Sequence, residues 1–194
     1  MDSLTQIVLG AAVGEAVLGR KVGNKALLYG AIGGTIPDLD VIARWFTDTI
    51  TATEIHRGFS HSIVFCLLLS PILGVLVNKL ERKLDLGWKS WTKLFFWALF
   101  THPILDAFTT WGTQLFWPFD IRLAFNSIFV IDPLYTLPFL VCCIIVLFLK
   151  KDSKRRYLTN KIGLIYSTSY LLLSVALKFI AFQHIKTEVE NKGI

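Results

Sequence analysis

Apolar residues recur along the chain in runs, and most runs are long enough to form a helix. Six such runs cover residues 4–19, 26–37, 62–78, 94–108, 133–149 and 162–182. A helix that crosses a bilayer needs about 20 mostly apolar residues, and the third, fifth and sixth runs come close to this length. Polar residues interrupt the other three runs, so neighbouring helices must cover them. The pattern predicts an all-α, polytopic membrane bundle of about five to six hydrophobic segments, some of them short or broken.

The composition supports a membrane protein. Hydrophobic residues make up 54% of the chain and charged residues only 18%, with a mean hydropathy of +0.57. A soluble domain of this length rarely has so apolar an average. No repeat or linker divides the chain, so we expect a single integral membrane domain over residues 1–194. The three cysteines, Cys66, Cys142 and Cys143, lie in apolar runs, and we interpret them as buried small hydrophobic side chains.

The positive charge indicates an orientation in the membrane. Of the 20 lysines and arginines, 14 lie in the segments 20–25, 79–93 and 150–161. The positive-inside rule places these segments in the cytoplasm, which fits a simple alternation of six segments. The chain is then a multi-pass protein of the bacterial inner membrane, and "TTWGTQLFWPF" fits an outer aromatic belt. The N-terminus lacks a basic region and a cleavage site, so we expect it to be retained.

Two pairs of glycines and one acidic residue stand out in the first two apolar runs. The glycines, each pair four residues apart, are Gly10 with Gly14 and Gly30 with Gly34. Such pairs let two helix backbones approach closely, although glycine is also simply frequent in membrane helices. We expect the acidic residue, Glu15, to pair with Arg20 near the inner face.

The remaining polar residues of the apolar regions all fall on the outer side in this topology. They are Gln6, Asp38, Asp40, His56, His61, His102, Asp106 and Asp132. At 1.5 Å per helical residue, Asp38 lies about 20 Å from Lys25, and Asp106 lies about 20 Å from Lys93. This is less than the hydrocarbon thickness of about 30 Å, so the residues would line a pocket below the outer surface. Ionisable groups at that depth need partners or a metal.

Three short motifs supply metal-ligating side chains. "THPILD" places His102 and Asp106 on one helix face, "PDLD" offers two aspartates at a helix break, and "HRGFSH" adds two histidines. The predicted metal ligands are Asp38, Asp40, His56, His61, His102 and Asp106. Imidazole and carboxylate ligands suit zinc, and also manganese or iron.

Several of these residues have a second interpretation. Asp38 and Asp40 could cap a helix, and His56 could be a loop residue or a substrate contact. Arg57 could anchor the chain at the interface or hold a phosphate oxygen. Candidates for supporting the ligands are Gln6, Ser60, Thr110 and Asp132. Thr110 could instead cap a helix end, and we favour a capping role for Asp132.

Together these residues resemble a known family. "MDSLTQIVLGAAVGEAVLGRKVGNKA", "GTIPDLD", "HRGFSHS", "THPILDAFTTWGTQLFWPF" and "FVIDPLYTLP" are similar to the bacterial inner-membrane, metal-dependent hydrolases of the YdjM type, also described as LexA-binding. The resemblance covers nearly the whole chain. That family is distantly similar to zinc-dependent phospholipase C and S1/P1 nuclease, which are helical enzymes that cleave phosphoesters with clustered zinc ions.

The resemblance implies a ligand set for one zinc. In those enzymes an aspartate, a later histidine and a His-x-x-x-Asp pair bind one zinc together. The matching positions are Asp38 or Asp40, then His56 or His61, then His102 and Asp106. Many members of the family have a histidine where this chain has Gln6, and no later His-x-x-x-Glu pair completes a three-metal cluster. We therefore expect one or two metal ions.

The sequence thus predicts a membrane-embedded, phospholipase-like hydrolase of phosphoesters, with a lipid or lipid-linked phosphate as substrate. Its site would open to the extracytoplasmic side, with Asp38, Asp40 and Arg57 in catalytic roles. Two other functions compete with this one. The first is a non-catalytic membrane regulator or scaffold that binds a cytoplasmic protein through its basic loops, and the second is a transporter. We expect membrane lipids as partners and no direct nucleic-acid binding.

Overall fold

The computed structural model describes residues 1–46 and 58–192, and its regular elements in this part of the chain are helices. The α-helices are α1 (Ser3–Val22), α2 (Asn24–Thr35), α4 (Ile63–Leu80), α5 (Trp88–Ala107), α6 (Pro133–Phe148) and α7 (Lys154–Asn191). The 3-10 helices are η1 (Ile36–Trp45), η2 (Phe59–His61) and η3 (Arg82–Leu84). The predicted all-α class is therefore confirmed.

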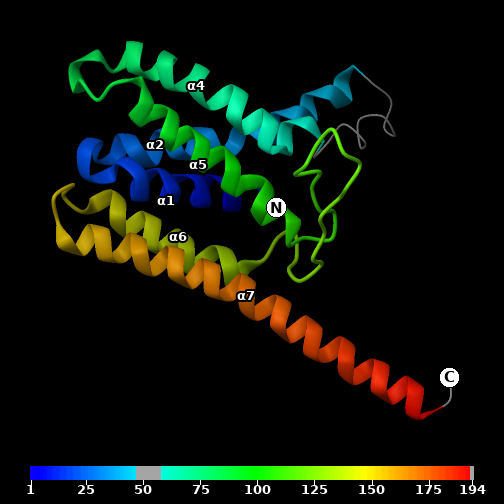
Figure 1. Ribbon diagram of the computed structural model, residues 1–194. Coiled ribbons are helices and arrows are strands. Elements are labelled where there is room, and N and C mark those ends of the chain that lie inside the picture. The colour runs from blue at the N-terminus through cyan, green and yellow to red at the C-terminus, as the bar shows by residue number, and fades with distance from the viewer. Residues whose placement is uncertain (47–57, 193–194) are drawn as a thin grey trace.

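Helix α1 is the centre of the bundle, and it packs against α2, α5, α6 and α7 (Figure 1). One apolar cluster joins α1 to α5 and α6 through Leu9, Leu105 and Phe139. A second cluster joins α4 to α5 around Cys66 and Trp91, which are both fully buried. The long, aromatic-rich loop between α5 and α6 closes one end of the bundle, on the right in Figure 1.

Helices α1 and α2 approach each other through their glycines. A Cβ atom added at Gly10 would lie 2.4 Å from the Gly30 carbonyl oxygen, and one added at Gly30 would lie 2.2 Å from the Gly10 carbonyl oxygen. Gly14 faces Ala26 and Gly30, and Gly34 faces Gln6 and Gly10, in the same way. No side chain larger than hydrogen fits between backbones this close, so the two predicted glycine pairs form one interface.

The helices alternate in direction, so their basic turns gather at one end. The turns between α1 and α2, α4 and α5, and α6 and α7 lie together on the left in Figure 1. The N-terminal end of α1 and the C-terminal end of α5 lie at the opposite end. The predicted bounds are close for the first two runs, but α5 begins at Trp88 rather than Leu94, because Gly87 ends the preceding turn with a φ of 71°. Helix α7 also extends well beyond the predicted run of 162–182.

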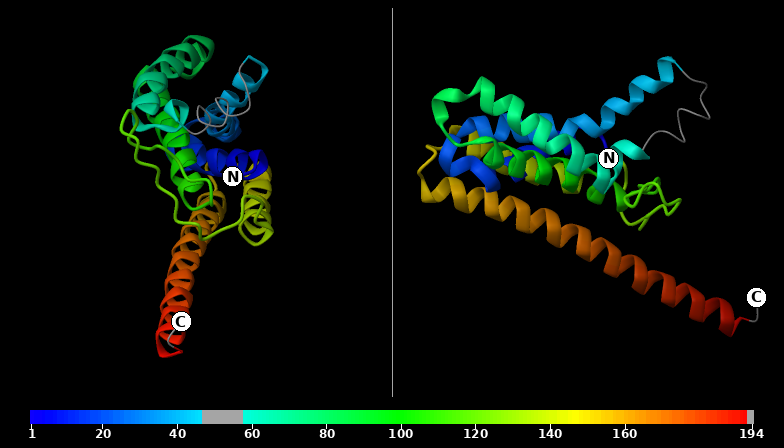
Figure 2. Two further views of the ribbon diagram at one scale, coloured as in Figure 1. Left: turned by 90° about the vertical axis from the view of Figure 1, so that its right-hand side faces the viewer. Right: turned by 45° about the horizontal axis from the view of Figure 1, so that its top comes forward.

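Among the described helices, α4 and α7 are long and apolar enough to cross a membrane by themselves. Helix α6 is apolar but shorter, α2 has only 12 residues, and polar residues interrupt α1 and α5. The prediction of five to six spans is therefore shown only in part: the described residues form six α-helices, of which these two pass this test. Helix α7 packs along α6 and then runs on past the bundle, as both views in Figure 2 show.

Glu15 does not pair with Arg20, contrary to the expectation from the sequence. Both of its carboxylate oxygens accept hydrogen bonds from the Arg156 guanidinium of α7, each at 2.7 Å. The pair is buried, and Arg156 also donates to the Asn24 side chain and to the Leu149 carbonyl oxygen. Arg20 instead lies over the Tyr157 ring, 4.3 Å from its centroid. The planar guanidinium of Arg156 thus ties α7 to α1.

Candidate metal centre

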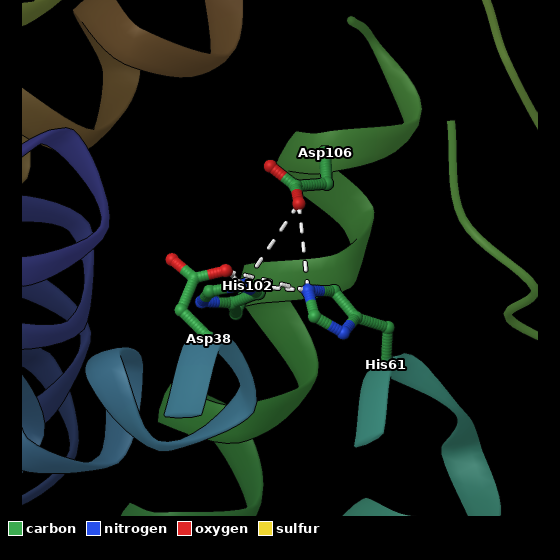
Figure 3. A group of neighbouring side chains, drawn as sticks. All are labelled: Asp38, His61, His102 and Asp106. Atoms are coloured by element: carbon green, nitrogen blue, oxygen red, sulfur yellow. Dashed lines mark hydrogen bonds and ion pairs between the residues drawn. The ribbon is translucent and has the colours of Figure 1, made fainter. Parts of the chain in front are cut away.

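Four side chains from three elements converge at the end of the bundle opposite the basic turns. They are Asp38 of η1, His61 of η2, and His102 and Asp106 of α5 (Figure 3). We call these four residues the His/Asp cluster. One ligand atom from each lies within 4.8 Å of the other three. His61, His102 and Asp106 are fully buried, whereas the Asp38 side chain is 19% exposed.

Local sequence explains how each residue reaches the cluster. Helix α2 ends just before Pro37, whose ring disfavours helix at the preceding residue, and the chain turns into η1 with Asp38 in its first turn. His61 ends η2, and the next residue, Ser62, caps α4 by accepting a hydrogen bond from the Phe65 amide. His102 and Asp106 are four residues apart on α5, so they share a face.

The distances inside the cluster resemble the edges of a metal coordination shell. The two histidine Nε2 atoms are 3.1 Å apart. Asp38 Oδ1 lies 3.3 Å from His102 Nε2 and 3.6 Å from His61 Nε2, and Asp106 Oδ2 lies 3.5 Å and 3.9 Å from His61 Nε2 and His102 Nε2. A tetrahedron with zinc–ligand bonds of about 2.0–2.1 Å has edges of about 3.3–3.4 Å. The four side chains therefore fit one divalent cation.

The hydrogen bonds on the far side of each imidazole favour the same conclusion. His102 Nδ1 lies 2.5 Å from the Gly34 carbonyl oxygen, which can only accept, so this nitrogen carries the proton. His61 Nδ1 faces Asp40 at 3.4 Å and the Ser60 hydroxyl at 3.0 Å, and that hydroxyl donates to Asp40 at 2.6 Å. Such partners leave each Nε2 lone pair directed at the centre of the cluster in the neutral imidazole, as in many metal sites.

Asp106 is held on its other side by α1. Gln6 Nε2 donates to Asp106 Oδ1 at 3.0 Å, and the Met1 amino group contacts the same oxygen. Gln6 also donates to the His102 carbonyl oxygen at 3.4 Å. The buried Gln6 Oε1 has no hydrogen-bond partner among the residues that the structure describes. The cluster thus borders on a buried acceptor oxygen that a bound water or cation could satisfy.

The charges of the His/Asp cluster favour the binding of a cation. Burial disfavours a charged Asp38, but hydrogen bonds with His102 and His61 outweigh it and lower the pKa of this carboxyl well below its usual range. Burial would likewise lower the pKa of His61, yet hydrogen bonds to Asp106, Asp38 and Asp40 raise it to about 10. The carboxylates of Asp38, Asp40 and Asp106 therefore keep a proton on His61, and a divalent cation can replace this proton.

Four of the six predicted ligands form the His/Asp cluster, and the other two are Asp40 and His56. Asp40 lies behind His61, on the ring nitrogen opposite the cluster, and Ser60 lies beside it. His56 and Arg57 fall outside the described residues. The contacts of the Gly34 carbonyl oxygen and the Met1 amino group could not be predicted from the sequence, because backbone groups leave no side-chain signal.

Two of the predicted supporting residues lie elsewhere. Asp132 accepts hydrogen bonds from the Tyr135 amide and the Tyr170 hydroxyl, so it caps α6 and ties it to α7, as favoured above. Thr110 is exposed, and no contact between it and the His/Asp cluster is seen among the described residues, so its support of the ligands stays a prediction. Its neighbour Thr109 is buried instead and donates to the Asp106 carbonyl oxygen at 2.7 Å, since it sits on the inner side of the turn that follows α5.

Comparison with known proteins agrees with the resemblance seen in the sequence. The model of the YdjM inner membrane protein family matches residues 1–185. The chain belongs to this family. Among curated relatives, the uncharacterized protein YfhP of Bacillus subtilis (strain 168) is 31% identical over 142 residues, which are 69% of this chain and 42% of YfhP. The inner membrane protein YbcI of Escherichia coli (strain K12) is 35% identical over 101 residues, 52% of this chain and 57% of YbcI.

Membership of the YdjM family supports a location in the bacterial inner membrane. The chain spans about half the length of the two curated relatives, and no solved structure matches it. Neither relative's name states an activity. The chemistry of this YdjM family member must therefore be argued from its His/Asp cluster.

Proposed function

We propose that this protein is a metal-dependent hydrolase of phosphoesters in the bacterial inner membrane. The observation that carries the proposal is the His/Asp cluster, in which two imidazole nitrogens and two carboxylate oxygens are spaced like the ligands of one cation. Asp38 is partly exposed while the other three residues are buried, so the cluster opens on the Asp38 side. A buried site with one accessible carboxylate suits a hydrolytic metal centre.

The residues at the site have different roles in the proposed hydrolysis. When bound, a divalent cation supplies Lewis acidity, which activates water and polarises a phosphoryl oxygen. Asp38 accepts a proton from the attacking water, whose oxygen bonds to phosphorus as the bond to the leaving alcohol breaks, and the alcohol oxygen takes up a proton from solvent water. Asp40 and Ser60 orient His61, and Gln6 orients Asp106.

Arg57 is the residue that we assign to the phosphate. It precedes His61 by four residues, so a fully extended chain would keep the two Cα atoms within about 14 Å. An arginine side chain spans much of that distance, and its planar guanidinium binds two phosphate oxygens at once. Nitrogen and carboxylate ligands in this number favour zinc, with manganese or iron as alternatives.

A lipid substrate is supported by an apolar groove formed by residues of α1, α2 and η1. Ile7, Ile32, Ile36 and Leu39 line this groove, whose volume is about 350 Å³. Ile7 and Leu39, which line the groove, are the chain neighbours of Gln6 and Asp38. An acyl chain in the groove would place a phosphate headgroup near Asp38. We assign the substrate accordingly to phospholipids or lipid-linked phosphates, with the site on the extracytoplasmic side.

A structural metal is the second candidate function. The full burial of His61, His102 and Asp106 favours it, because structural sites are closed to solvent. Such a metal would join η1 and η2 to α5 without turnover. The two functions differ in what metal removal does: a structural site predicts loss of folded protein, and a catalytic site predicts a folded but inactive one.

The first experiment measures metal content and turnover together. Wild type purified in detergent should hold stoichiometric zinc, manganese or iron by plasma mass spectrometry, and should cleave a phospholipid in mixed micelles. The variant His102→Ala with Asp106→Ala should lose both metal and turnover. A matched control, His184→Ala with Asp120→Ala, removes the same residue types from exposed positions and should retain both.

The outcomes separate the candidates. A folded wild type that binds no zinc or manganese after incubation would exclude both metal functions. Bound metal without cleavage of phospholipid or of a synthetic phosphodiester would favour the structural site. Turnover that survives in the double variant would place the reaction elsewhere in the molecule.

A further inference from the structure

A second cavity lies at the opposite end of the bundle from the His/Asp cluster. It has a volume of about 270 Å³ and is formed by the last turns of α1, the turn before α7 and the first turns of α7. We call it the basic cavity. The cations that line it are Arg20, Lys21 and Lys151. None of the three forms an ion pair with a carboxylate in the part of the chain that the structure describes.

The one carboxylate in the basic cavity is already neutralised. Glu15 lines the cavity, but both of its oxygens accept hydrogen bonds from Arg156. An anion entering the cavity would therefore meet three cations without a competing free carboxylate. Cations gathered in a recess attract an anion more strongly than the same cations spread on an open surface, because the recess excludes part of the solvent.

A buried polar group indicates more than a bare anion. Asn160 is 4% exposed and lines the basic cavity. Its Nδ2 donates to the Ala12 carbonyl oxygen at 3.0 Å, which fixes the orientation of the amide. Its Oδ1 is buried and has no hydrogen-bond partner among the described residues. A buried acceptor without a partner is costly, so the ligand should carry a hydroxyl or another donor in addition to its anion.

The walls of the basic cavity also fit a lipid. Ala16, Val17 and Leu18 line it alongside the cations, and Leu158, next to the lining residue Tyr157, is 50% exposed. The cavity lies at the end where the basic turns gather, which is where such a protein meets the headgroups of one leaflet. A headgroup there could place its phosphate on the cations while its acyl chains leave along the apolar face.

We propose that the basic cavity binds the headgroup of an anionic phospholipid that carries a hydroxyl, such as a phosphoglycerol headgroup. The phosphate contacts Arg20, Lys21 and Lys151, and a headgroup hydroxyl donates to Asn160 Oδ1. This site is separate from the His/Asp cluster and does not depend on its chemistry.

Thermal unfolding of the full chain in detergent, titrated with short-chain lipids, tests the proposal. Dihexanoyl phosphatidylglycerol should raise Tm saturably, because a ligand that binds only the folded state stabilises it. Dihexanoyl phosphatidylmethanol has the same charge without the hydroxyl and should bind more weakly. Dihexanoyl phosphatidylcholine and inorganic phosphate should produce no saturable shift at the same concentrations.

Variants locate the effect in the cavity. Lys21→Gln with Lys151→Gln should weaken phosphatidylglycerol binding by about fivefold for each cation removed, about 25-fold in all. Lys83→Gln with Lys93→Gln removes the same charge from exposed positions at the same end and should leave binding unchanged. Asn160→Leu should abolish the preference for phosphatidylglycerol over phosphatidylmethanol while retaining the response to both.

Three results would overturn the proposal. Equal shifts with phosphatidylcholine and phosphatidylglycerol would show that charge is not recognised. Equal weakening in the two lysine pairs would indicate attraction by the surface as a whole and no specific site. A saturable shift with inorganic phosphate matching that with phosphatidylglycerol would assign the cavity to a free anion. If Asn160→Leu does not fold, the lysine variants and the lipid series still decide the outcome.

Discussion

At the scale of single residues, the two aspartates of the "PDLD" motif lie on opposite sides of one imidazole. Asp38 joins the His/Asp cluster at His61 Nε2, and Asp40 lies at His61 Nδ1. A 3-10 helix has three residues per turn, so side chains two residues apart point about 120° away from each other. The two carboxylates therefore point to different places. Asp38 lies in the His/Asp cluster beside His61, and Asp40 orients the His61 ring from the other side.

The proton on His61 makes a prediction about pH. Its pKa is raised from 6.5 to about 10, so the proton stabilises the metal-free protein fully below about pH 6.5 and this stability is lost as the pH rises through 10. A metal must displace that proton, so its apparent affinity should rise about tenfold per pH unit within this window. Zinc titrations against a competing chelator at pH 7 and pH 8 measure the slope.

Two variants control the pH experiment. His184→Ala removes an exposed histidine and should keep the dependence of zinc affinity on pH. His61→Gln should bind zinc weakly and show no such dependence on pH. An affinity of the wild type that is the same at both pH values would show that His61 is already neutral in the metal-free protein.

Gln6 makes a second prediction at this scale. Its amide donates to Asp106 Oδ1, so Gln6→Leu removes a partner of a ligand and leaves all four members of the His/Asp cluster in place. Loss of such a partner typically weakens metal binding about 10- to 100-fold. Zinc affinity should fall by that factor in Gln6→Leu and stay unchanged in Gln183→Leu, a surface control on α7. Unchanged affinity in Gln6→Leu would mean that the other contacts of Asp106 suffice to orient it.

At the scale of elements, the sequence predicts the parts that local rules control. Alternation of apolar runs and basic turns gives the helices and their directions, and spacing places His102 with Asp106 on one face. Capping residues such as Ser62 and Asp132 lie where the helices begin. The pattern of apolar runs could not predict the start of α5 at Trp88, because polar and aromatic residues precede Leu94 and interrupt the apolar run.

The interface between α1 and α2 makes a prediction at the scale of elements. An added Cβ at Gly30 would meet backbone atoms of Gly10 and Gly14, which cannot move without separating the helices. Gly34, whose carbonyl oxygen holds His102, lies one turn further along α2. Gly30→Ala should therefore lower both Tm and zinc affinity.

A second glycine provides the comparison for Gly30→Ala. At Gly163 an added Cβ would lie 3.0 Å from the Cys142 Cβ and 3.2–3.3 Å from Phe139 ring atoms, which is tight but farther than the backbone contacts at Gly30. Gly163→Ala should lower Tm less and leave zinc affinity unchanged, as measured by thermal unfolding and chelator competition. Equal losses in the two variants would show that the glycine interface does not position the metal centre.

At the scale of the whole molecule, long-range contacts decide what the sequence could not. Glu15 and Arg156 are 141 residues apart, and their pairing depends on how α7 returns to α1. Arg20, which is nearer in sequence, was the expected partner, but it lies over Tyr157 instead. The choice between Asp38 and Asp40 likewise depends on the phase of η1 relative to α5. Such contacts follow from tertiary packing, which leaves no local pattern in the chain.

The arrangement of the molecule predicts which end faces the cytoplasm. The basic turns lie at one end and the His/Asp cluster at the other, so the positive-inside rule places the cluster on the extracytoplasmic side.

Asp120 lies in the exposed loop at the cluster end, and Asp152 lies in the exposed turn between α6 and α7. In intact spheroplasts, a membrane-impermeant maleimide should label Asp120→Cys and leave Asp152→Cys unlabelled, while lysed cells should show both labelled. Wild type sets the background, because Cys66 and Cys143 are buried and Cys142 is partly buried. Labelling of Asp152→Cys alone in intact spheroplasts would reverse the orientation and place the cluster toward the cytoplasm, where its substrate would have to come from the inner leaflet.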